Sequence, residues 1–297
     1  MQTTEAIRRR LETTEDLRSI VRTMKALATV SIRQYEEALA SLEEYVRGVN
    51  LGMQALLRLR PGSIPELAAR PPARPASIVF GSDQGLCGAF NEQIATHFLE
   101  SWARVSAGET PGPVLAVGTR VAARLEEGGT RLAGILTLPV SAPTITRLVG
   151  EILERIDVWR ASGEQDGVYL YFNRNDSRSI YRPHTEVLLP IPVAYLRALA
   201  SAPWRPRAVP ALSTDWETLF AAVVREYLFV TLHRAVAESM ASEHAARRAA
   251  MHSAERSIDD RLVELRGELN QLRQSAITTE LLDIVSGYEV LRGEEPV

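Results

Sequence analysis

The first sixty residues carry apolar side chains at helical spacing. From residue 21 to residue 56 the repeat advances by alternating steps of three and four, which is the pattern of a coiled-coil seam. Its positions are Val21, Met24, Ala28, Ser31, Tyr35, Ala38, Leu42, Tyr45, Val49, Gly52 and Leu56, and the same phase extends back through Leu17, Thr14 and Ile7. The pattern predicts a single helix over about residues 3 to 58.

The C-terminal part predicts a second long helix. Thr214 and Glu217 have the spacing of a capping box, and only two glycines interrupt the helix-forming residues up to Tyr288. Residues 235–254 include eleven alanines and serines, small side chains that let helix axes approach closely. The three-four repeat returns at Leu262, Leu265, Leu269, Leu272, Ala276 and Thr279. We expect the two long helices to pair as an antiparallel coiled coil, because each needs a partner for its seam.

Proline divides the chain into segments because it interrupts helices. All 16 prolines lie at or beyond Pro61, and after Pro210 the next one is Pro296. This distribution predicts an N-terminal coiled-coil helix over 1–60, a proline-rich linker over 61–75, a central α/β domain over 76–205 and a C-terminal coiled-coil helix over 212–290.

The middle of the chain alternates between strand-like and helix-like segments. Strands are expected at 77–80, 114–117, 135–138 and 167–173, helices at 89–105, 119–127 and 144–160, and a returning edge strand at 179–192. This order is typical of an α/β sheet domain. The predicted fold class is therefore α/β plus a long antiparallel coiled coil. The N- and C-terminal helices form the coil, and the central α/β sheet domain has Rossmann-like layering.

Composition excludes several classes of function. Lys and Arg number 34 against 37 Asp and Glu, so the net charge of −3 gives no reason to expect nucleic acid as a partner. A single cysteine, Cys87, excludes an internal disulfide framework and a cysteine-rich metal site. No apolar run approaches the roughly 18 residues that cross a bilayer, and we expect no secretory signal at the N-terminus.

The most enzyme-like string is GSDQGLCG at residues 81–88, which follows the first predicted strand. Glycines in such a place can cradle a phosphate on free backbone N–H groups. However, the spacing of Gly81, Gly85 and Gly88 is not that of a dinucleotide-binding fingerprint, and no P-loop lysine follows. A tight structural turn is therefore favoured over a ligand site.

The titratable residues form no recognisable catalytic or metal-binding set. The five histidines lack metal-ligand spacing, and Cys87 has no recognisable histidine partner. Charge placement is more informative, because residues 17–35 contain no acid but include Arg18, Arg22, Lys25 and Arg33. This basic stretch is either a solvated helix face or a collar that meets an acidic partner surface.

Three patches resemble the γ subunit of F-type ATP synthases, and the similarity extends along nearly the whole chain. They are SIVRTMKALATVSIRQ at 19–34, GSDQGLCGAFN at 81–91, and MASEHAARRAAMHSAE at 240–255 followed by LRQSAITTELLDIVSG at 272–287. Gln84 stands where the family usually has arginine, and residues 212–216 depart from its acidic-proline pattern. The sequence is identified as a divergent bacterial member of this family.

The resemblance implies a rotor shaft. In that family the terminal helices form an antiparallel coiled coil inside a hexamer of three α and three β subunits, and the α/β domain meets the ε subunit and the membrane ring of c subunits. The shaft transmits torque between this c-ring and the hexamer. ATP chemistry belongs to the α and β subunits, so the shaft is not an enzyme and needs no cofactor. The implied location is peripheral, on the cytoplasmic face of the bacterial inner membrane.

The resemblance also implies contacts with the β subunits. Met24 matches the family methionine that faces an acidic lever of β, beside Arg22 and Lys25, and Arg247 lies in the matching patch of the last helix. The family's polar cluster that catches β loops is matched by Arg273, Gln274, Thr278 and Glu280. The segment LLDIV at 281–285 is implied to be an apolar tip that turns in an apolar sleeve. The alternative for each residue is a role in stabilising or solvating the coil.

Two other functions remain open from the residues alone. The central domain could belong to a nucleotide-dependent enzyme that uses the coil as a dimerisation arm, or the chain could be a static coiled-coil scaffold. Binding of ATP, NAD or FAD by the isolated chain would indicate the enzyme. Co-purification with α and β subunits would indicate the shaft.

Overall fold

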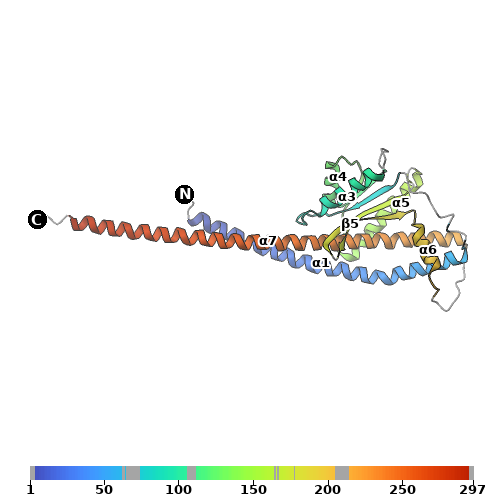
Figure 1. Cartoon of the computed structure of the whole chain (residues 1–297), viewed down its shortest axis with the longest axis horizontal. Helices are drawn as coiled ribbons and strands as arrows, with labels where there is room; N and C mark the ends of the chain where they lie inside the picture. The colour runs from blue at the N-terminus through green and yellow to red at the C-terminus, as the bar shows by residue number, and fades with distance from the viewer. Residues whose placement is uncertain are drawn as a thin grey trace. The chain divides into compact units, whose positions relative to one another are not determined.

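The computed structural model describes residues 4–61, 64, 74–105, 112–163, 165, 167–176, 178–204 and 214–293. The chain divides into two compact units. We call Met1–Leu27 with Arg248–Val297 the helical unit, and Ala28–Arg247 the sheet unit. Two unbroken helices contribute to both units: α1, Thr4–Leu59, has 56 residues and α7, Trp216–Gly293, has 78 (Figure 1).

The predicted antiparallel pairing of the two long helices is confirmed within each unit. In the helical unit, Glu15 of α1 contacts Arg266 of α7, and Arg22 contacts Glu255. In the sheet unit, the ring of Tyr35 stacks on His244, and the hydroxyl of Tyr45 donates a hydrogen bond to Glu226. In each unit, partners further along α1 lie further back along α7, as antiparallel helices require.

The N-terminus of α7 is capped by a different residue from the one predicted. The backbone N–H of Thr218 donates to Oδ2 of Asp215 at 2.8 Å, so Asp215 and not Thr214 supplies the capping oxygen. This hydrogen bond lowers the pKa of the Asp215 carboxyl. An aspartate in this place satisfies one free N–H and also interacts favourably with the helix dipole.

The sheet unit contains a five-stranded sheet in the order β3-β2-β1-β4-β5. Its strands are β1 (Ala76–Phe80), β2 (Val114–Val117), β3 (Leu132–Leu136), β4 (Val168–Asp176) and β5 (Ser179–Leu189). Strands β1 to β4 are parallel, and β5 returns antiparallel to β4 as predicted. At the centre Ile78 pairs with Leu115 on one side and Leu170 on the other. Strands β1 and β2 are buried along their whole length, which is typical of a parallel sheet covered on both faces.

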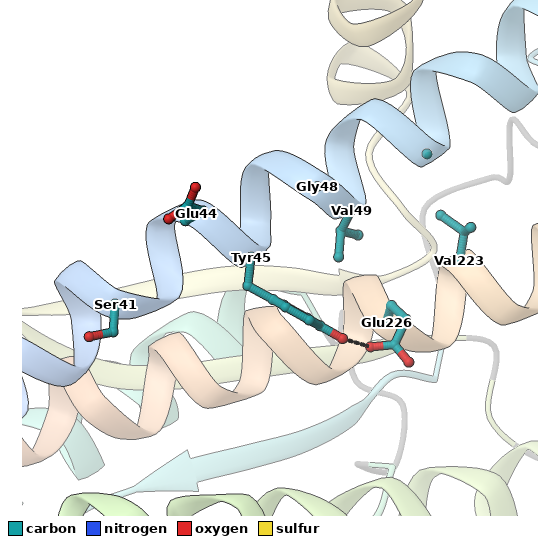
Figure 2. Close-up of a pocket in the computed structure, with 8 residues that line it drawn as sticks. Ser41, Glu44, Tyr45, Gly48, Val49, Val223 and Glu226 are labelled. Atoms are coloured by element: carbon teal, nitrogen blue, oxygen red, sulfur yellow. Dashed lines mark hydrogen bonds between the residues drawn. The ribbon is translucent and has the colours of Figure 1, made fainter. Parts of the chain in front are cut away.

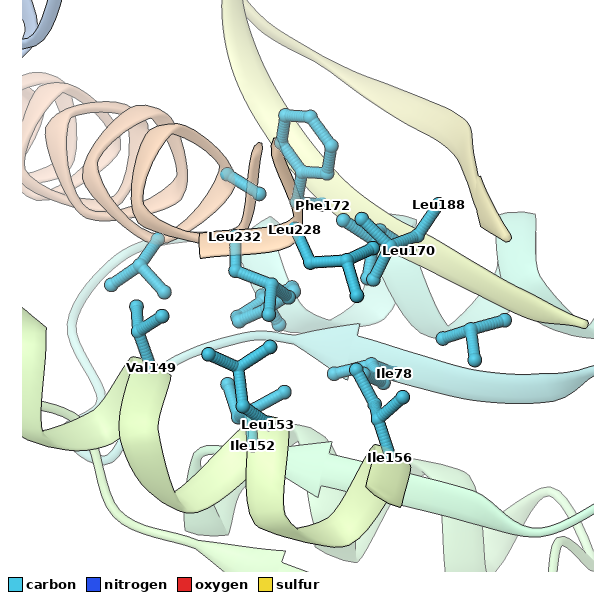
Figure 3. Packing of buried hydrophobic residues seen from close by; sticks show 14 of the residues in the cluster. Ile78, Val149, Ile152, Leu153, Ile156, Leu170, Phe172, Leu188, Leu228 and Leu232 are labelled. Carbon is cyan, nitrogen blue, oxygen red and sulfur yellow. The ribbon is translucent and has the colours of Figure 1, made fainter. Parts of the chain in front are cut away.

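Helices cover both faces of this sheet, which confirms the Rossmann-like layering. One face packs against α3 (Phe90–Val105) and α4 (Thr119–Glu127) through an apolar cluster that includes Val79, Phe98 and Val121. The other face packs against α5 (Ile145–Ser162) and against the sheet-unit parts of α1 and α7. Figure 3 shows Leu228 and Leu232 of α7 reaching the same cluster as Ile152 of α5 and Phe172 of β4.

Smaller differences separate the prediction from the structure of the sheet unit. The strand expected at 135–138 lies earlier, at β3, and α6 (Val193–Ser201) was not predicted. Most of the expected linker, residues 62–63 and 65–73, lies outside the described residues, as do 211–213 and 294–297.

In the helical unit the seam of α1 keeps most of the predicted positions. Ile7, Thr14, Val21 and Met24 are buried or half-buried, as the repeat predicted. Leu17 was expected inside but is 49% exposed. Arg18 and Lys25 are also half-buried, although the repeat did not include them. The prediction was wrong at Leu17 and missed the two basic residues because α7 supplies carboxylates opposite Arg18 and Lys25, and paired charges can occupy a seam.

The seam of α7 follows the predicted phase only in part. Leu262 and Leu265 are buried and Leu269 and Leu272 are half-buried, but Ala276 and Thr279 are exposed. Every side chain described from residue 273 to residue 287 is exposed. The antiparallel pairing explains the change, because α7 continues past Thr4, the first described residue of α1.

Candidate functional site

The turn at residues 81–88 is closed by hydrogen bonds within the sheet unit. The backbone N–H of Ser82 donates to Oδ1 of Asn91 at 2.9 Å, and Nδ2 of Asn91 donates back to the Ser82 hydroxyl at 2.8 Å. A Cβ at Gly81 would lie 2.3 Å from the Cβ of Val121, and Gly88 has a φ of +61°. Gly85 has neither constraint, whereas Leu86 adopts a φ of +64°. Close packing and hydrogen bonding thus fix this turn.

Asp83 ties the turn to the ends of two neighbouring strands. Its Oδ1 accepts from the N–H of Thr119, after β2, at 2.8 Å, and its Oδ2 accepts from the N–H of Leu138, after β3, at 2.7 Å. In β4, the amide of Asn173 donates to the carbonyl of Phe90 at 3.1 Å. In open α/β sheets, ligands bind at these carboxyl ends of the strands. In this chain the Asp83 side chain and its hydrogen-bond partners occupy that position.

A buried ion pair of α7 covers the same turn. Nη2 of Arg247 lies 2.6 Å from Oε1 of Glu243, and the two side chains are only 7% and 6% exposed. The same Nη2 donates long hydrogen bonds to the carbonyls of Gln84 and Gly85, at 3.5 and 3.4 Å. Arg247 therefore points inward at the turn, although the sequence suggested a contact with another subunit.

Burial dominates the titration of this cluster. It raises the pKa of the Glu243 carboxyl to about 7, against the opposing effect of Arg247. Burial, followed by the charge of Arg247, lowers the pKa of His244 to about 4, so this ring is neutral at pH 7. Burial also raises the pKa of the Cys87 thiol, which keeps it protonated and a poor nucleophile.

In the helical unit, basic residues of α1 pair with acids of α7. Glu255 accepts from Nε of Arg22 at 2.8 Å and from Nζ of Lys25, and Arg18 pairs with Asp259 at 2.6 Å. The hydrogen bonds from Lys25 and then Arg22 lower the pKa of the Glu255 carboxyl to about 2. Much of the predicted basic collar is therefore neutralised within the unit.

The predicted polar cluster lies on the exposed end of α7. Arg273, Gln274, Thr278 and Glu280 are all exposed, and the Thr278 hydroxyl donates to the carbonyl of Gln274 at 2.9 Å. Large apolar side chains, 53–63% exposed, surround this cluster, and they are Ile277, Leu281, Leu282, Ile284 and Val285. Such a dense group of exposed apolar residues is typical of an interaction surface.

The structure groups the candidate residues in two ways. Arg22 and Lys25 meet at Glu255, and Met24 lies half-buried beside them, whereas Arg247 meets the glycine-containing turn. Glu243, Glu255 and Asp259 were not predicted from the sequence as site residues. The i,i+4 spacing of Glu243 and Arg247 was visible in the sequence, but the pairing of Glu255 requires the alignment of two helices.

Two pockets in the described part of the sheet unit lie beside α1 and α7. Figure 2 shows one of about 610 Å³ between α1 and α7, where Tyr45 reaches Glu226 and Gly48 and Val49 line the wall. The Tyr45 hydroxyl donates to Oε2 of Glu226 at 2.5 Å, which engages one carboxylate oxygen and raises the pKa of the tyrosine. A larger groove of about 870 Å³ contains the ion pair of Arg234 with Glu186.

The described residues show neither a metal-binding cluster nor a membrane-spanning helix. Among the described residues, no group of three His, Cys, Asp or Glu side chains could hold a metal ion. No helix in the described part of the chain is both long and apolar enough to cross a membrane.

Comparison with known proteins identifies the family. The profile of a family described as ATP synthase matches residues 3–291. The ATP synthase gamma chain of Syntrophus aciditrophicus is 30% identical over 96% of this chain and 97% of its own length. The chain belongs to the ATP synthase gamma chain family. The gamma chain of Cupriavidus metallidurans is 27% identical, with 97% of this chain and 99% of the relative covered.

Solved structures support the same fold for this gamma chain. A chain from the Euglena gracilis mitochondrial ATP synthase (OSCP/F1/c-ring, rotational state 3) has a TM-score of 0.65 at 17% identity, covering 99% of this chain and 96% of that one. A chain from the central stalk and c-ring of the Tetrahymena thermophila mitochondrial ATP synthase has a TM-score of 0.57 at 19% identity, covering 79% and 99%. The long helices and the sheet are thus shared with gamma chains of distant sequence.

Proposed function

We propose that this chain is the central shaft of a rotary ATP synthase and transmits torque between the membrane c-ring and the catalytic α and β subunits. The observation that carries the proposal is the pair of unbroken helices, antiparallel in each unit, in a member of the gamma chain family. A torque carrier must resist bending and twisting. Helices without proline that pair with each other in both units meet that need.

The shaft acts by biasing conformations and has no chemistry of its own. Each orientation presents a different side of the shaft to each β subunit, and so favours a different state of that subunit's nucleotide site. The shaft is thus the non-catalytic part of the complex. The turn at residues 81–88 supports this proposal over the nucleotide-dependent enzyme, because the N–H of Ser82 and both carboxylate oxygens of Asp83 are already engaged by the chain.

The proposed contacts with β divide into exposed and buried groups. Met24, Arg22 and Lys25 are proposed to face the acidic lever of β, and the exposed end of α7 to meet β loops through Arg273, Gln274, Thr278 and Glu280. Ile277 and the apolar residues of 281–285 are proposed to turn against an apolar sleeve. We assign Arg247 a positioning role, because its guanidinium holds the turn at residues 84–85.

The other proposed partners are the remaining subunits of the complex. The terminal helices, 1–60 and 212–290, are proposed to enter the hexamer, and the α/β domain, 76–205, to meet the ε subunit and the c-ring. The chain is then a peripheral part of a membrane-bound complex. We place it on the cytoplasmic face of the bacterial inner membrane.

Reconstitution tests the proposal. The chain is co-expressed with its α, β, ε and c subunits, and ATP-driven ion pumping is measured in vesicles. We expect the chain to co-purify with α and β, and pumping to disappear when the chain is omitted. A chain that fails to co-purify, or pumping that persists without it, would contradict the shaft. Micromolar binding of ATP, NAD or FAD to the isolated chain would instead favour the enzyme.

A further inference from the structure

The guanidinium of Arg247 is shared between two kinds of acceptor. Its Nη2 lies 2.6 Å from Oε1 of Glu243 but 3.5 and 3.4 Å from the carbonyls of Gln84 and Gly85 in the turn. A carboxylate is the stronger acceptor, because hydrogen bonds to a charged group are shorter and stronger than those to a neutral one. The ionised form of Glu243 therefore draws the guanidinium away from the turn.

Glu243 also has an oxygen that is suited to bind a proton. Among the described residues, its Oε2 is buried and has no hydrogen-bond partner, whereas Oε1 engages Arg247. A buried carboxylate oxygen without a donor has a cost in free energy that protonation relieves. Because burial raises the pKa of this carboxyl to about 7, both of its forms are populated near neutral pH.

The groups that surround Glu243 titrate elsewhere. The titratable and charged groups of this cluster are Arg247 and His244 of α7, Asp83 and Cys87 of the turn, Tyr35 of α1, and Tyr181 of β5, which faces Cys87. Burial raises the pKa of Tyr35 to about 12 and lowers that of His244 to about 4. Burial also raises the pKa of the Cys87 thiol. Of these shifted groups, Glu243 has its pKa nearest to 7.

We propose that Glu243 is a proton-operated latch, which sets how firmly Arg247 holds the turn at residues 81–88. With a proton on Oε2, the carboxyl no longer attracts the guanidinium as a charge, and Nη2 moves closer to the carbonyls of Gln84 and Gly85. Nη1 lies 3.1 Å from Nδ1 of His244, a neutral ring that keeps the guanidinium beside the turn in either form. Loss of the proton weakens the hold on the turn.

The direction of the pH effect follows from proton linkage. Opening of the turn exposes Glu243 to water, where its pKa falls from about 7 towards 4.5, so the closed turn binds the proton more tightly than the open one. Opening is therefore rarest at low pH, becomes more frequent as pH rises from 4.5 to 7, and changes little above pH 7. The latch is a property of this chain alone, so it is tested separately from the proposed function.

Cys87 reports the opening of the turn, because it is the single cysteine of the chain and is only 2% exposed. The complete wild-type chain and Glu243→Gln, which has the shape of the protonated carboxyl and cannot ionise, are treated with excess 4,4′-dithiodipyridine at several pH values. We expect the ratio of the wild-type rate to the variant rate to rise about tenfold between pH 5 and pH 8. The charge of Glu243 raises the pKa of Cys87 and so would only slow the wild type.

Glu238→Gln is the matched control. Burial raises the pKa of Glu238 too, but this carboxyl interacts with Arg234 and Arg174 and lies in the groove of about 870 Å³. We expect the thiol of this variant to react at the wild-type rate at every pH. If Glu238→Gln changes the pH dependence as Glu243→Gln does, the effect does not come from the latch.

Hydrogen exchange of the wild type gives a second measurement, which needs no variant to fold. The N–H of Ser82 donates to Asn91 and closes the turn, whereas the N–H of Ile78 in β1 reports unfolding of the sheet. Corrected for the intrinsic exchange rate, protection of Ser82 relative to Ile78 should fall about tenfold between pH 5 and pH 8. A constant ratio of thiol rates, or equal pH dependence of the two amides, would overturn the latch.

Discussion

Two carboxylates of α7, Glu243 in the sheet unit and Glu255 in the helical unit, pair with basic side chains in opposite surroundings. Arg247, the partner of Glu243, is 7% exposed, whereas Arg22 and Lys25, the partners of Glu255, are 53% and 32% exposed. Burial therefore controls the first pair and raises the pKa of Glu243, while hydrogen bonds control the second and lower the pKa of Glu255. The same chemistry fixes a turn in one unit and aligns two helices in the other.

The apolar residues of the two units differ in the same way. In the sheet unit the apolar side chains of α7 lie inside, as Leu232 does at 0% exposure. In the helical unit the inward side of α1 includes Arg18 and Lys25, and apolar residues such as Leu27 lie outside. The sheet unit thus buries its apolar side chains within its own core. The outer face of the helical unit is suited to contacts with other subunits.

Truncating one leucine in each unit should give the largest difference. Leu232→Ala removes a fully buried side chain and should lower the free energy of unfolding by about 3 kcal/mol, because it leaves a cavity. Leu27→Ala, at 62% exposure, should change it by less than about 0.5 kcal/mol. Urea denaturation of the isolated chain, followed by tryptophan fluorescence and circular dichroism, measures both. Equal losses would contradict the contrast between the units.

Much of the fold could be predicted because its signals are local. Strand β2 and helix α4 have the bounds that the sequence predicted, since apolar runs and helical spacing act over a few residues. The seam of α1 could not be fixed in this way. Val21 and Met24 lie inside as the repeat predicts, but the half-buried place of Lys25 depends on Glu255, 230 residues after Lys25.

Prediction of the candidate site was limited in the same way, because some of its features depend on neighbouring residues and others on distant ones. That the 81–88 string forms a turn follows from its glycines, but its closure depends on the N–H of Leu138, 55 residues beyond Asp83. The inward direction of Arg247 depends on its contact with Gly85, 162 residues away. Residue type and spacing therefore identified the important segments. The direction in which each side chain points could be determined only from the packed structure.

The buried pair should give an effect of similar size that depends on pH. Because the pKa of Glu243 is about 7 in the folded chain and about 4.5 unfolded, the unfolded chain releases this proton first as pH rises. The wild type should therefore lose stability relative to Glu243→Gln between pH 4.5 and pH 7, by about 3 kcal/mol in total, since one pKa unit corresponds to about 1.4 kcal/mol.

Urea denaturation of both proteins across this pH range measures the difference in slope. Comparing the slopes avoids the separate cost of leaving Arg247 beside a neutral side chain, which is the same at every pH. Parallel stability curves from pH 4.5 to pH 7 would show that burial does not control this carboxyl.

Glu255 should give the smallest effect, with the opposite sign. Its pKa is lowered from 4.5 to about 2 in the folded chain, so its ionised form stabilises the helical unit above pH 4.5. That stability should be lost as pH falls towards 2. Glu255→Gln lacks this contribution, so the wild type should be slightly more stable near neutrality, and the two proteins should converge on acidification.

Helicity measured by circular dichroism during thermal unfolding includes this unit, whereas tryptophan fluorescence would not report it, because all four tryptophans lie in the sheet unit. Glu264→Gln is the matched control: Glu264 pairs with Arg261 of the same helix and makes no link to α1 through that pair. It should leave the pH dependence as in the wild type. If the two variants behave alike, the link from Glu255 to Arg22 and Lys25 does not align the helices, and the contrast between the two units reduces to burial alone.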